Sequence, residues 1–235
     1  PCPLNPDTCR LSLIVCVLDS HDVVRRQLLH LNRVLRPECE LILIDDGSKP
    51  SLQDACESVA KDYDFRLIFT DDERPWTQPK GRNLGASVAQ ADKLLFFDID
   101  HIVTENIVQT CLNYPGDKLH WVRKPGVLDD GGDIVTAEEA LKDHGLTNDS
   151  SSVHVNSFMI SKELFDLLGG YDEKFCGAYG GDDVDFNGRY ARLCELGIAK
   201  PDEVKGEGYA YPEPASDQKG LFHSLSRHSM NPVAA

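Results

Sequence analysis

The amino-acid sequence predicts an α/β fold, in which a mostly parallel central sheet is flanked by helices within a single domain. Apolar, strand-like runs alternate with helix-like segments over residues 11–100. The connections between them are short, which is typical of helices that link parallel strands and cover both faces of a sheet. The 235 residues fit one large domain or two small ones, and we predict one.

The first half of the sequence supplies most of the predicted sheet. Its strands are apolar runs at residues 11–18, 40–45, 65–69 and 93–97. Its helices show helical apolar spacing or follow a capping residue, at 22–35, 51–61 and 80–91. In such sheets a ligand binds outside the carboxyl ends of the strands, so we expect the functional site there.

The second half is less regular. Helices are expected to begin at Thr104, Ser161 and Gly181, and strands at 119–124 and 153–160. Residues 125–150 are polar and rich in Gly and Asp, which indicates a long connection with a functional reason. The remainder after the last helix is rich in Pro, Ser and His and is expected to form a tail packed over the body.

Composition narrows the function classes. The net charge of −15 argues against a nucleic-acid partner, because such proteins display a basic face. The eight cysteines form no C-x-x-C pair, which argues against a zinc site. The longest apolar run, residues 11–18, is too short to span a membrane. The sequence begins with Pro rather than Met, which leaves room for a removed targeting or anchor segment.

Carboxylates follow three of the predicted parallel strands. They are Asp45 and Asp46, Asp71 and Asp72, and Asp98 and Asp100. Because the carboxyl ends of parallel strands meet at one edge, we expect these acids to converge. Hard oxygen ligands favour Mg²⁺ or Mn²⁺, usually shared with substrate phosphates. One pair alone could cap a helix or line a solvated turn, but three together favour a nucleotide–metal site.

Five motifs, in this order, resemble those of GT-A glycosyltransferases, close to the inverting family 2 enzymes. They are LSLIVCVL, LIDDGS, GRNLGA, FFDID and GGDDVDF. The last of them, with SRHSMN near the C-terminus, also resembles β-1,4-galactosyltransferases. The similarity spans roughly residues 11–230. It implies one GT-A domain with a nucleotide-binding half at 11–103, an acceptor and catalytic half at 104–212, and a tail or lid at 213–235.

The resemblance also implies which residues bind the nucleotide. Asp45 or Asp46 would hold the base or ribose, and Arg82 would contact the base or pyrophosphate. Val17, with Leu18, would line the base pocket, although CVLD departs from the Pro-Thr-Tyr-Asn-like phrase usual at this place.

In the D-x-D pair, the resemblance directs Asp98 toward the ribose and Asp100 onto the metal. Galactosyltransferase-like enzymes complete the metal shell with a histidine from a C-terminal segment, and His228 matches it by its local motif. A nitrogen ligand shifts preference from Mg²⁺ toward Mn²⁺, so the expected cofactor is Mn²⁺, or else Mg²⁺. A histidine in a polar tail can equally be solvated.

The chemistry of glycosyl transfer fits these residues. A divalent cation neutralises the charge on the leaving nucleoside diphosphate, and the acceptor hydroxyl must lose a proton to a carboxylate. Asp183 matches the catalytic base of the family, and Asp182 its acceptor-binding neighbour. Gly181, directly before them, lets a sugar approach the backbone closely. The alternative is that these acids only complement a helix dipole.

The resemblance therefore implies a metal-dependent, inverting transfer of a sugar from a nucleotide-sugar to a carbohydrate or glycoconjugate hydroxyl. UDP is the commonest nucleotide of the family and is the one expected here, and nothing in the sequence excludes GDP or dTDP. The expected location is the cytoplasm, or the Golgi lumen if an N-terminal anchor was removed. The oligomeric state has no signature in the sequence.

Three other classes share part of the pattern. LLFFDIDHIV resembles the signature of haloacid-dehalogenase-type phosphatases, with Asp98 as nucleophile and Asp100 as general acid. That signature normally lies on the first strand, whereas here three strand–helix pieces precede it. A nucleotidyltransferase would carry a Gly-rich loop after its first strand, and LDSHDVVRR has no glycine. A catalytically inactive sugar-binding module is the third alternative.

Overall fold

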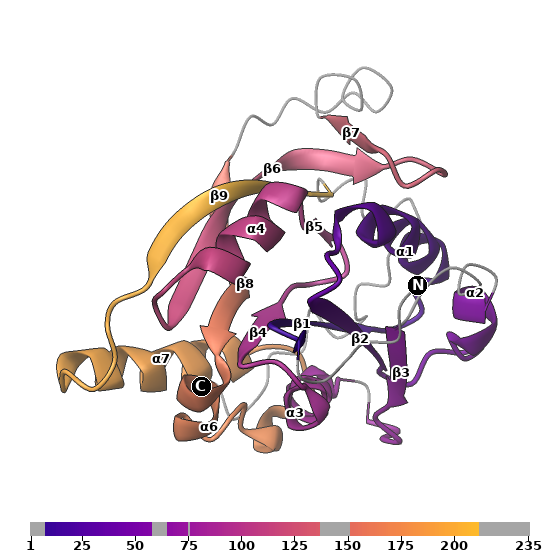
Figure 1. Ribbon diagram of the computed structural model, residues 1–235. Helices are drawn as coiled ribbons and strands as arrows, with labels where there is room; N and C mark the ends of the chain where they lie inside the picture. Colours follow the sequence, from indigo (N-terminus) through magenta and orange to yellow (C-terminus); the bar gives the residue numbers. More distant parts are fainter. Residues whose placement is uncertain (1–7, 58–64, 75, 137–150, 212–235) are drawn as a thin grey trace.

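The computed structural model describes residues 8–57, 65–74, 76–136 and 151–211, and a curled sheet lies at its centre (Figure 1). The strands are β1 Leu11–Val17, β2 Cys39–Asp45, β3 Phe65–Phe69, β4 Lys93–Phe96, β5 His101–Ile102, β6 Lys118–Leu128, β7 Ile134–Thr136, β8 Ser152–Ser161 and β9 Glu203–Ala210. The helices are α1 His21–Val34, α2 Gln53–Glu57, α3 Gln78–Val88, α4 Glu105–Asn113, α6 Lys162–Leu167, α7 Asp182–Glu195 and the short 3₁₀ helix η3 Glu173–Phe175.

The strand order is β3-β2-β1-β4-β8-β6-β9-β5, with β7 paired to β6. The first four strands are parallel to one another, as predicted. β8 lies between β4 and β6 and is antiparallel to both, so the sheet as a whole is mixed. Parallel neighbours need a crossover connection, whereas β6 and β7 are joined by a tight turn and therefore run antiparallel. The α/β fold class is confirmed, and the parallel arrangement belongs mainly to the first half.

The strand register sets the level at which the acidic segments emerge. Val17 on β1 lies beside Asp45 on β2, which in turn lies beside Phe69 on β3. On the other side of β1, Ile14 pairs with Phe96 of β4. The ends of β2, β3 and β4 therefore open at the same edge of the sheet, as the sequence predicts.

Both faces of the sheet are covered. One core joins alternate strand residues such as Leu13 and Val15 to the apolar sides of α1 and α4. The other core contains Ile14, Phe96 and Phe158 together with side chains of α3, α6 and α7. Successive residues of a strand point to opposite faces, which explains why a continuous apolar run is buried on both sides.

Helix starts follow local capping chemistry. Thr104 accepts a hydrogen bond from the Ile107 N–H and begins α4, and Ser161 does the same for α6 through the Leu164 N–H. The predicted helix at 51–61 appears as α2 in its described part, because residues 58–64 lie outside the described ones. Among the described residues, no helix is long and apolar enough to cross a membrane.

Two predictions about the second half were wrong. Residues 125–136 were expected to be part of a long connection, yet β6 continues to Leu128 and forms a hairpin with β7. Asp129 closes the turn by accepting hydrogen bonds from the N–H groups of Gly131 and Asp133.

Residues 203–210 were expected to belong to a tail, yet they form β9, which pairs with both β6 and β5. Backbone pairing rather than an apolar pattern forms this strand, since its first residues are exposed.

Candidate active site

The two carboxylates after β2 are both buried, at 2 % and 6 % exposure for Asp45 and Asp46. Asp45 accepts hydrogen bonds from the backbone N–H groups of Ser48 at 2.8 Å and Leu52 at 3.0 Å, so it shapes the loop that leads to α2. Asp46 accepts from the Thr77 N–H at 3.2 Å and from the Thr77 hydroxyl. Burial raises the pKa of Asp46 to about 6. Their predicted contact with a base or ribose stays a prediction.

Of the two carboxylates after β3, Asp71 is exposed and Asp72 lies in a local ion-pair cluster. Asp72 accepts from the Arg74 guanidinium at 2.7 Å and from the Lys80 ammonium at 3.2 Å. The hydrogen bonds from Arg74 hold the pKa of Asp72 well below its usual range. This cluster neutralises Asp72 within its own loop, which makes it a weaker candidate for a metal ligand than the acids after β4.

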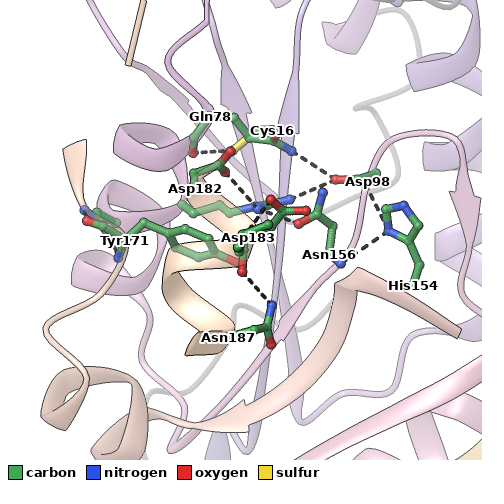
Figure 2. Close-up of polar contacts among 12 residues, drawn as sticks. Cys16, Gln78, Asp98, His154, Asn156, Tyr171, Asp182, Asp183 and Asn187 are labelled. Carbon is green, nitrogen blue, oxygen red and sulfur yellow. Dashed lines mark hydrogen bonds and ion pairs between the residues drawn. The ribbon is translucent and has the colours of Figure 1, made fainter. Parts of the chain in front are cut away.

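Asp98, at the end of β4, is held on one side by two donors. Its Oδ1 accepts from Arg82 Nη2 and from Gln78 Nε2, each at 2.9 Å (Figure 2). Its Oδ2 lies 3.7 Å from His154 Nδ1. Burial opposes ionisation of Asp98, but the charge of Arg82, the two neighbouring imidazoles and the Gln78 hydrogen bond together outweigh it, so the pKa of Asp98 is lowered. Asp98 is therefore an oriented carboxylate that stays ionised.

Arg82 links the two halves of the chain. It comes from α3, is only 2 % exposed, and contacts Asp98 at the end of β4. Its Nη1 donates to Asn156 Oδ1 on β8 at 3.2 Å and lies 3.8 Å from Asp182 Oδ2 on α7. The guanidinium also lies over the Tyr171 ring, 4.9 Å from its centroid. The predicted contact of Arg82 with base or pyrophosphate stays a prediction, and its internal contacts are the structural finding.

Two consecutive glycines bring the α7 acids to this point. Gly180 and Gly181 both have φ of +91°, in the left-handed region that favours glycine, and Gly181 caps the helix. Asp182 and Asp183 follow as the first residues of α7 and belong to the same group of polar side chains as Asp98 (Figure 2). The sequence predicts this helix start, and the structure confirms it.

The two α7 acids have different surroundings. Asp182 is 3 % exposed, and its Oδ2 accepts no hydrogen bond from any described residue. Burial raises the pKa of Asp182 above its ordinary value. Asp183 is half-buried, and its Oδ1 accepts from the Val184 N–H at 2.8 Å. Asp183 is therefore the acid that a substrate can reach, and Asp182 lies beneath it against Arg82.

A buried polar network supports α7 from the sheet. Asn187 donates to the backbone carbonyl of Asp183 at 2.8 Å and accepts from the Lys118 ammonium at 3.1 Å. Lys118 is 2 % exposed and lies 3.1 Å from His120 Nε2 and 3.6 Å from Asp202 Oδ2. Sequence reasoning missed these residues, because a lysine that begins a strand normally points its charge into solvent.

Two further site residues that sequence reasoning missed come from β8. His154 and Asn156 point toward Asp98 (Figure 2), while Val153 and Val155 lie on the other face with 45 % exposure each. The alternation of polar and apolar residues in VHVN was the available signal, since it marks a strand with two different faces.

The metal prediction rests on the acids after β4. Ligand atoms of Asp98, His101 and His154 all lie within 4.8 Å of one another. The Asp100 side chain is 24 % exposed, and its Oδ1 lies 3.9 Å from His101 Nε2. A mixed set of carboxylate oxygen and imidazole nitrogen fits a divalent cation such as Mn²⁺. The predicted roles of Asp100 and His228 stay predictions, and His228 lies outside the described residues.

The base-pocket prediction concerned the end of β1. The Val17 side chain is 1 % exposed and packs in the core between the sheet and α1. Its carbonyl accepts from the Asp46 N–H at 2.8 Å. Leu18 follows and is half-buried. A contact between Val17 and a nucleotide base stays a prediction. Because the Val17 side chain is buried in the core, such a contact would have to involve the backbone of Val17.

Comparison with known proteins agrees with the sequence motifs. Residues 12–119 match the sequence model of glycosyl transferase family 2. The chain is 27 % identical over 101 residues to "Glycosyltransferase GlyG" of Streptococcus pneumoniae, covering 43 % of this chain and 33 % of that protein. It is 28 % identical over 105 residues to "Cholesterol galactosyltransferase" of Borreliella burgdorferi, covering 44 % of this chain and 28 % of that protein. The matched stretches thus span about a third of these relatives.

Solved structures share the fold. S. aureus TarS 1–349 in complex with UDP-GlcNAc superposes with a TM-score of 0.64 at 16 % identity, covering 86 % of this chain and 58 % of that one. The mannosyltransferase PcManGT from Pyrobaculum calidifontis, in complex with GDP-Man and Mn²⁺, gives 0.61 at 15 % identity, covering 91 % and 61 %. The predicted resemblance is confirmed: this chain has the GT-A fold and is family 2-like over residues 12–119.

Proposed function

We propose that this chain transfers a sugar from a nucleotide-sugar to an acceptor hydroxyl with the help of a divalent cation. The observation that carries the proposal is the Arg82 bridge. It joins Asp98, at the edge where a parallel sheet binds its ligand, to the acids that begin α7. Glycosyl transfer requires a nucleotide side and a proton-accepting side in one site, and the bridge supports assigning those sides to Asp98 and to the α7 acids.

The residues divide into three roles. Asp98 and Asp100 offer carboxylate oxygens to the cation, which when bound offsets the negative charge that grows on the leaving diphosphate. Asp183, half-buried at the start of α7, takes the proton of the acceptor hydroxyl. Asp182, buried beneath Asp183 and against Arg82, is the neighbouring carboxylate that supports acceptor binding from below.

Arg82 and Asn187 position these groups. Arg82 is almost fully enclosed, and its partners belong to three different elements. Asn187 holds the carbonyl of Asp183 and is itself held by Lys118. The proposed transfer is inverting, with Asp183 as the base for the acceptor hydroxyl and no covalent sugar–enzyme intermediate.

For the donor we propose a UDP-sugar, and for the acceptor a carbohydrate or glycoconjugate hydroxyl. Among structural neighbours, TarS was solved with UDP-GlcNAc and PcManGT with GDP-Man and Mn²⁺. Both donors present a diphosphate next to the sugar, which is the group that a cation at the acidic sheet edge would bind.

A nucleotide-sugar screen tests the proposal. Thermal stability is measured with UDP-, GDP- and dTDP-sugars, each with and without Mn²⁺, because a ligand that binds the native state raises the melting temperature. Stabilisation by one UDP-sugar that depends on Mn²⁺, followed by transfer of that sugar to an acceptor, is the expected result. Hydrolysis of a generic phosphate ester, abolished by Asp98→Asn, with no response to any nucleotide-sugar, would instead establish the phosphatase alternative.

A further inference from the structure

A cluster of possible metal ligands lies just after β4. Within the described part of the chain, Asp98, His101 and His154 each offer a ligand atom, and these atoms lie within 4.8 Å of one another. They come from the ends of β4, β5 and β8, which the antiparallel pairing of β8 with β4 brings together. The three do not have the same freedom to bind a metal.

His101 has both ring nitrogens engaged. Its Nδ1 is hydrogen-bonded to the Ser157 hydroxyl, and its Nε2 lies 2.6 Å from Arg123 Nη1. The guanidinium can only donate, so His101 Nε2 must use its lone pair to accept. The ring is 1 % exposed, and a cation would have to displace the charged Arg123 to reach it. His101 is therefore a structural residue rather than a ligand.

His154 is more accessible than His101. Its side chain is 32 % exposed, and the donor that its Nδ1 meets among the described residues is a neutral backbone N–H, that of Asn156 at 3.2 Å. An N–H donor at that distance is at the long end of the normal range, and it shows that Nδ1 carries the lone pair. The same nitrogen lies 3.7 Å from Asp98 Oδ2.

Asp98 presents its Oδ2 in the manner of an oriented metal ligand. Its other oxygen is held by Arg82 and Gln78, and such outer hydrogen bonds fix the direction of a ligating carboxylate. Metal–ligand bonds of about 2.1 Å allow two donor atoms up to about 4.2 Å apart to share one cation. The separation of 3.7 Å between Asp98 Oδ2 and His154 Nδ1 satisfies that limit, and a cation bound there would replace the long Asn156 N–H hydrogen bond on Nδ1.

We propose that His154 of β8 supplies the nitrogen ligand of the cation site, sharing the cation with Asp98 Oδ2 and with Asp100. This inference rests on the metal dependence of the proposed function. It gives Asp98, which the family resemblance directs toward the ribose, a direct part in cation binding. It also removes the need for His228 as the nitrogen donor. A nitrogen among the ligands makes the site prefer Mn²⁺ to Mg²⁺.

The test uses Mn²⁺ alone and the full chain stripped of metal. Pulsed electron paramagnetic resonance detects ¹⁴N coupling when an imidazole binds Mn²⁺, and a titration of the free-ion signal gives the affinity. In the wild type and in His228→Gln, we expect ¹⁴N coupling and equal affinity. In His154→Gln, we expect the coupling to disappear and Mn²⁺ binding to weaken by at least about tenfold.

Two results overturn the inference: ¹⁴N coupling that survives in His154→Gln, or its loss in His228→Gln alone. Circular dichroism checks that His154→Gln is folded, and His154→Ala serves as the second variant. The outcome is separable from the proposed function. If His154→Gln transferred sugar and bound Mn²⁺ as the wild type does, the proposed function would be supported and the assignment of His154 as a ligand would be refuted. Coupling through His154 in a protein that transfers no sugar would do the reverse.

Discussion

Arg82 Nη2 donates to Asp98 Oδ1 at 2.9 Å, while Arg82 Nη1 lies 3.8 Å from Asp182 Oδ2. One enclosed guanidinium thus faces a carboxylate from the end of β4 and another from the start of α7. Buried charges are costly unless they are paired, so these three groups depend on one another. The link between the two halves of the site is an ionic one, and it can be removed by single substitutions.

Arg82→Met is expected to lower the free energy of unfolding by about 3–5 kcal/mol, because it leaves the buried Asp182 and the partly buried Asp98 without their counter-charge. Urea unfolding measures the change. Arg33→Met is the matched control, since Arg33 pairs with Asp133 at the surface, where both side chains are largely exposed. Loss of such a pair costs less than about 1 kcal/mol. Equal effects of the two substitutions would show that the Arg82 bridge contributes little to stability.

Asp183→Asn is expected to slow sugar transfer by about two to four orders of magnitude and to leave donor affinity unchanged, because a general base acts only in the chemical step. Turnover and donor dissociation constants are measured separately. Asp185→Asn is the control on the same helix turn, since Asp185 is bound to Arg189 through a hydrogen bond of 2.9 Å. A loss of donor affinity in Asp183→Asn, with turnover of bound donor intact, would place Asp183 in the nucleotide site.

The raised pKa of Asp46 leads us to expect that the stability of the protein depends on pH. Burial raises its pKa in the folded protein to about 6, above the ordinary value of 3.8. Between these two values the folded state binds more protons than the unfolded state, so stability falls as the pH rises from about 4 to about 6. Asp46→Asn mimics the protonated side chain and should remove that fall. Urea unfolding at pH 4.5 and pH 7 measures the difference, and an unchanged slope in Asp46→Asn would refute the assignment.

Alanine substitutions at two helical glycines are expected to change the stability of the protein in opposite directions. A Cβ at Gly85 on α3 would lie 2.5 Å from the Ile14 Cγ2 in the core, and such overpacking typically costs about 1–3 kcal/mol. A Cβ at Gly188 on α7 meets no atom within 4 Å, so Gly188→Ala should gain about 0.5–1 kcal/mol from helix propensity. Unfolding free energies of the two variants provide the comparison. Stabilisation by Gly85→Ala would mean that α3 can shift away from β1 without loss.

The sequence predicted the first half of the fold closely because its strands are buried on both faces and read as unbroken apolar runs. Its helices carry apolar residues at regular helical spacing. β9 was not predicted from the sequence, because a strand can be held in a sheet by backbone pairing alone. Its residues Glu203 and Lys205 are exposed and give no apolar signal. The local pattern of apolar and polar residues in the sequence does not indicate such pairing.

The site was predictable where acids follow strands, and less so where distant segments meet. The D-x-D pair and the α7 acids have local signatures, and the structure brings Asp98 and Asp182 to the same guanidinium. His154 depends on β8 lying between β4 and β6, an arrangement that no local pattern specifies. IDDGS was open to two interpretations, and in the structure Asp45 is engaged in its own loop.

The position of β8 has a consequence for dissecting the chain into fragments. The region matched by the family 2 model ends at residue 119, yet β4 pairs along its whole length with β8, from Lys93 beside Ser161 to Phe96 beside Phe158. A fragment that stops at residue 119 would leave β4 as a bare apolar edge, ready to pair with another molecule. Such a fragment should precipitate on expression and be digested rapidly by protease. The stretch most easily identified by sequence is therefore not a unit that can be purified alone.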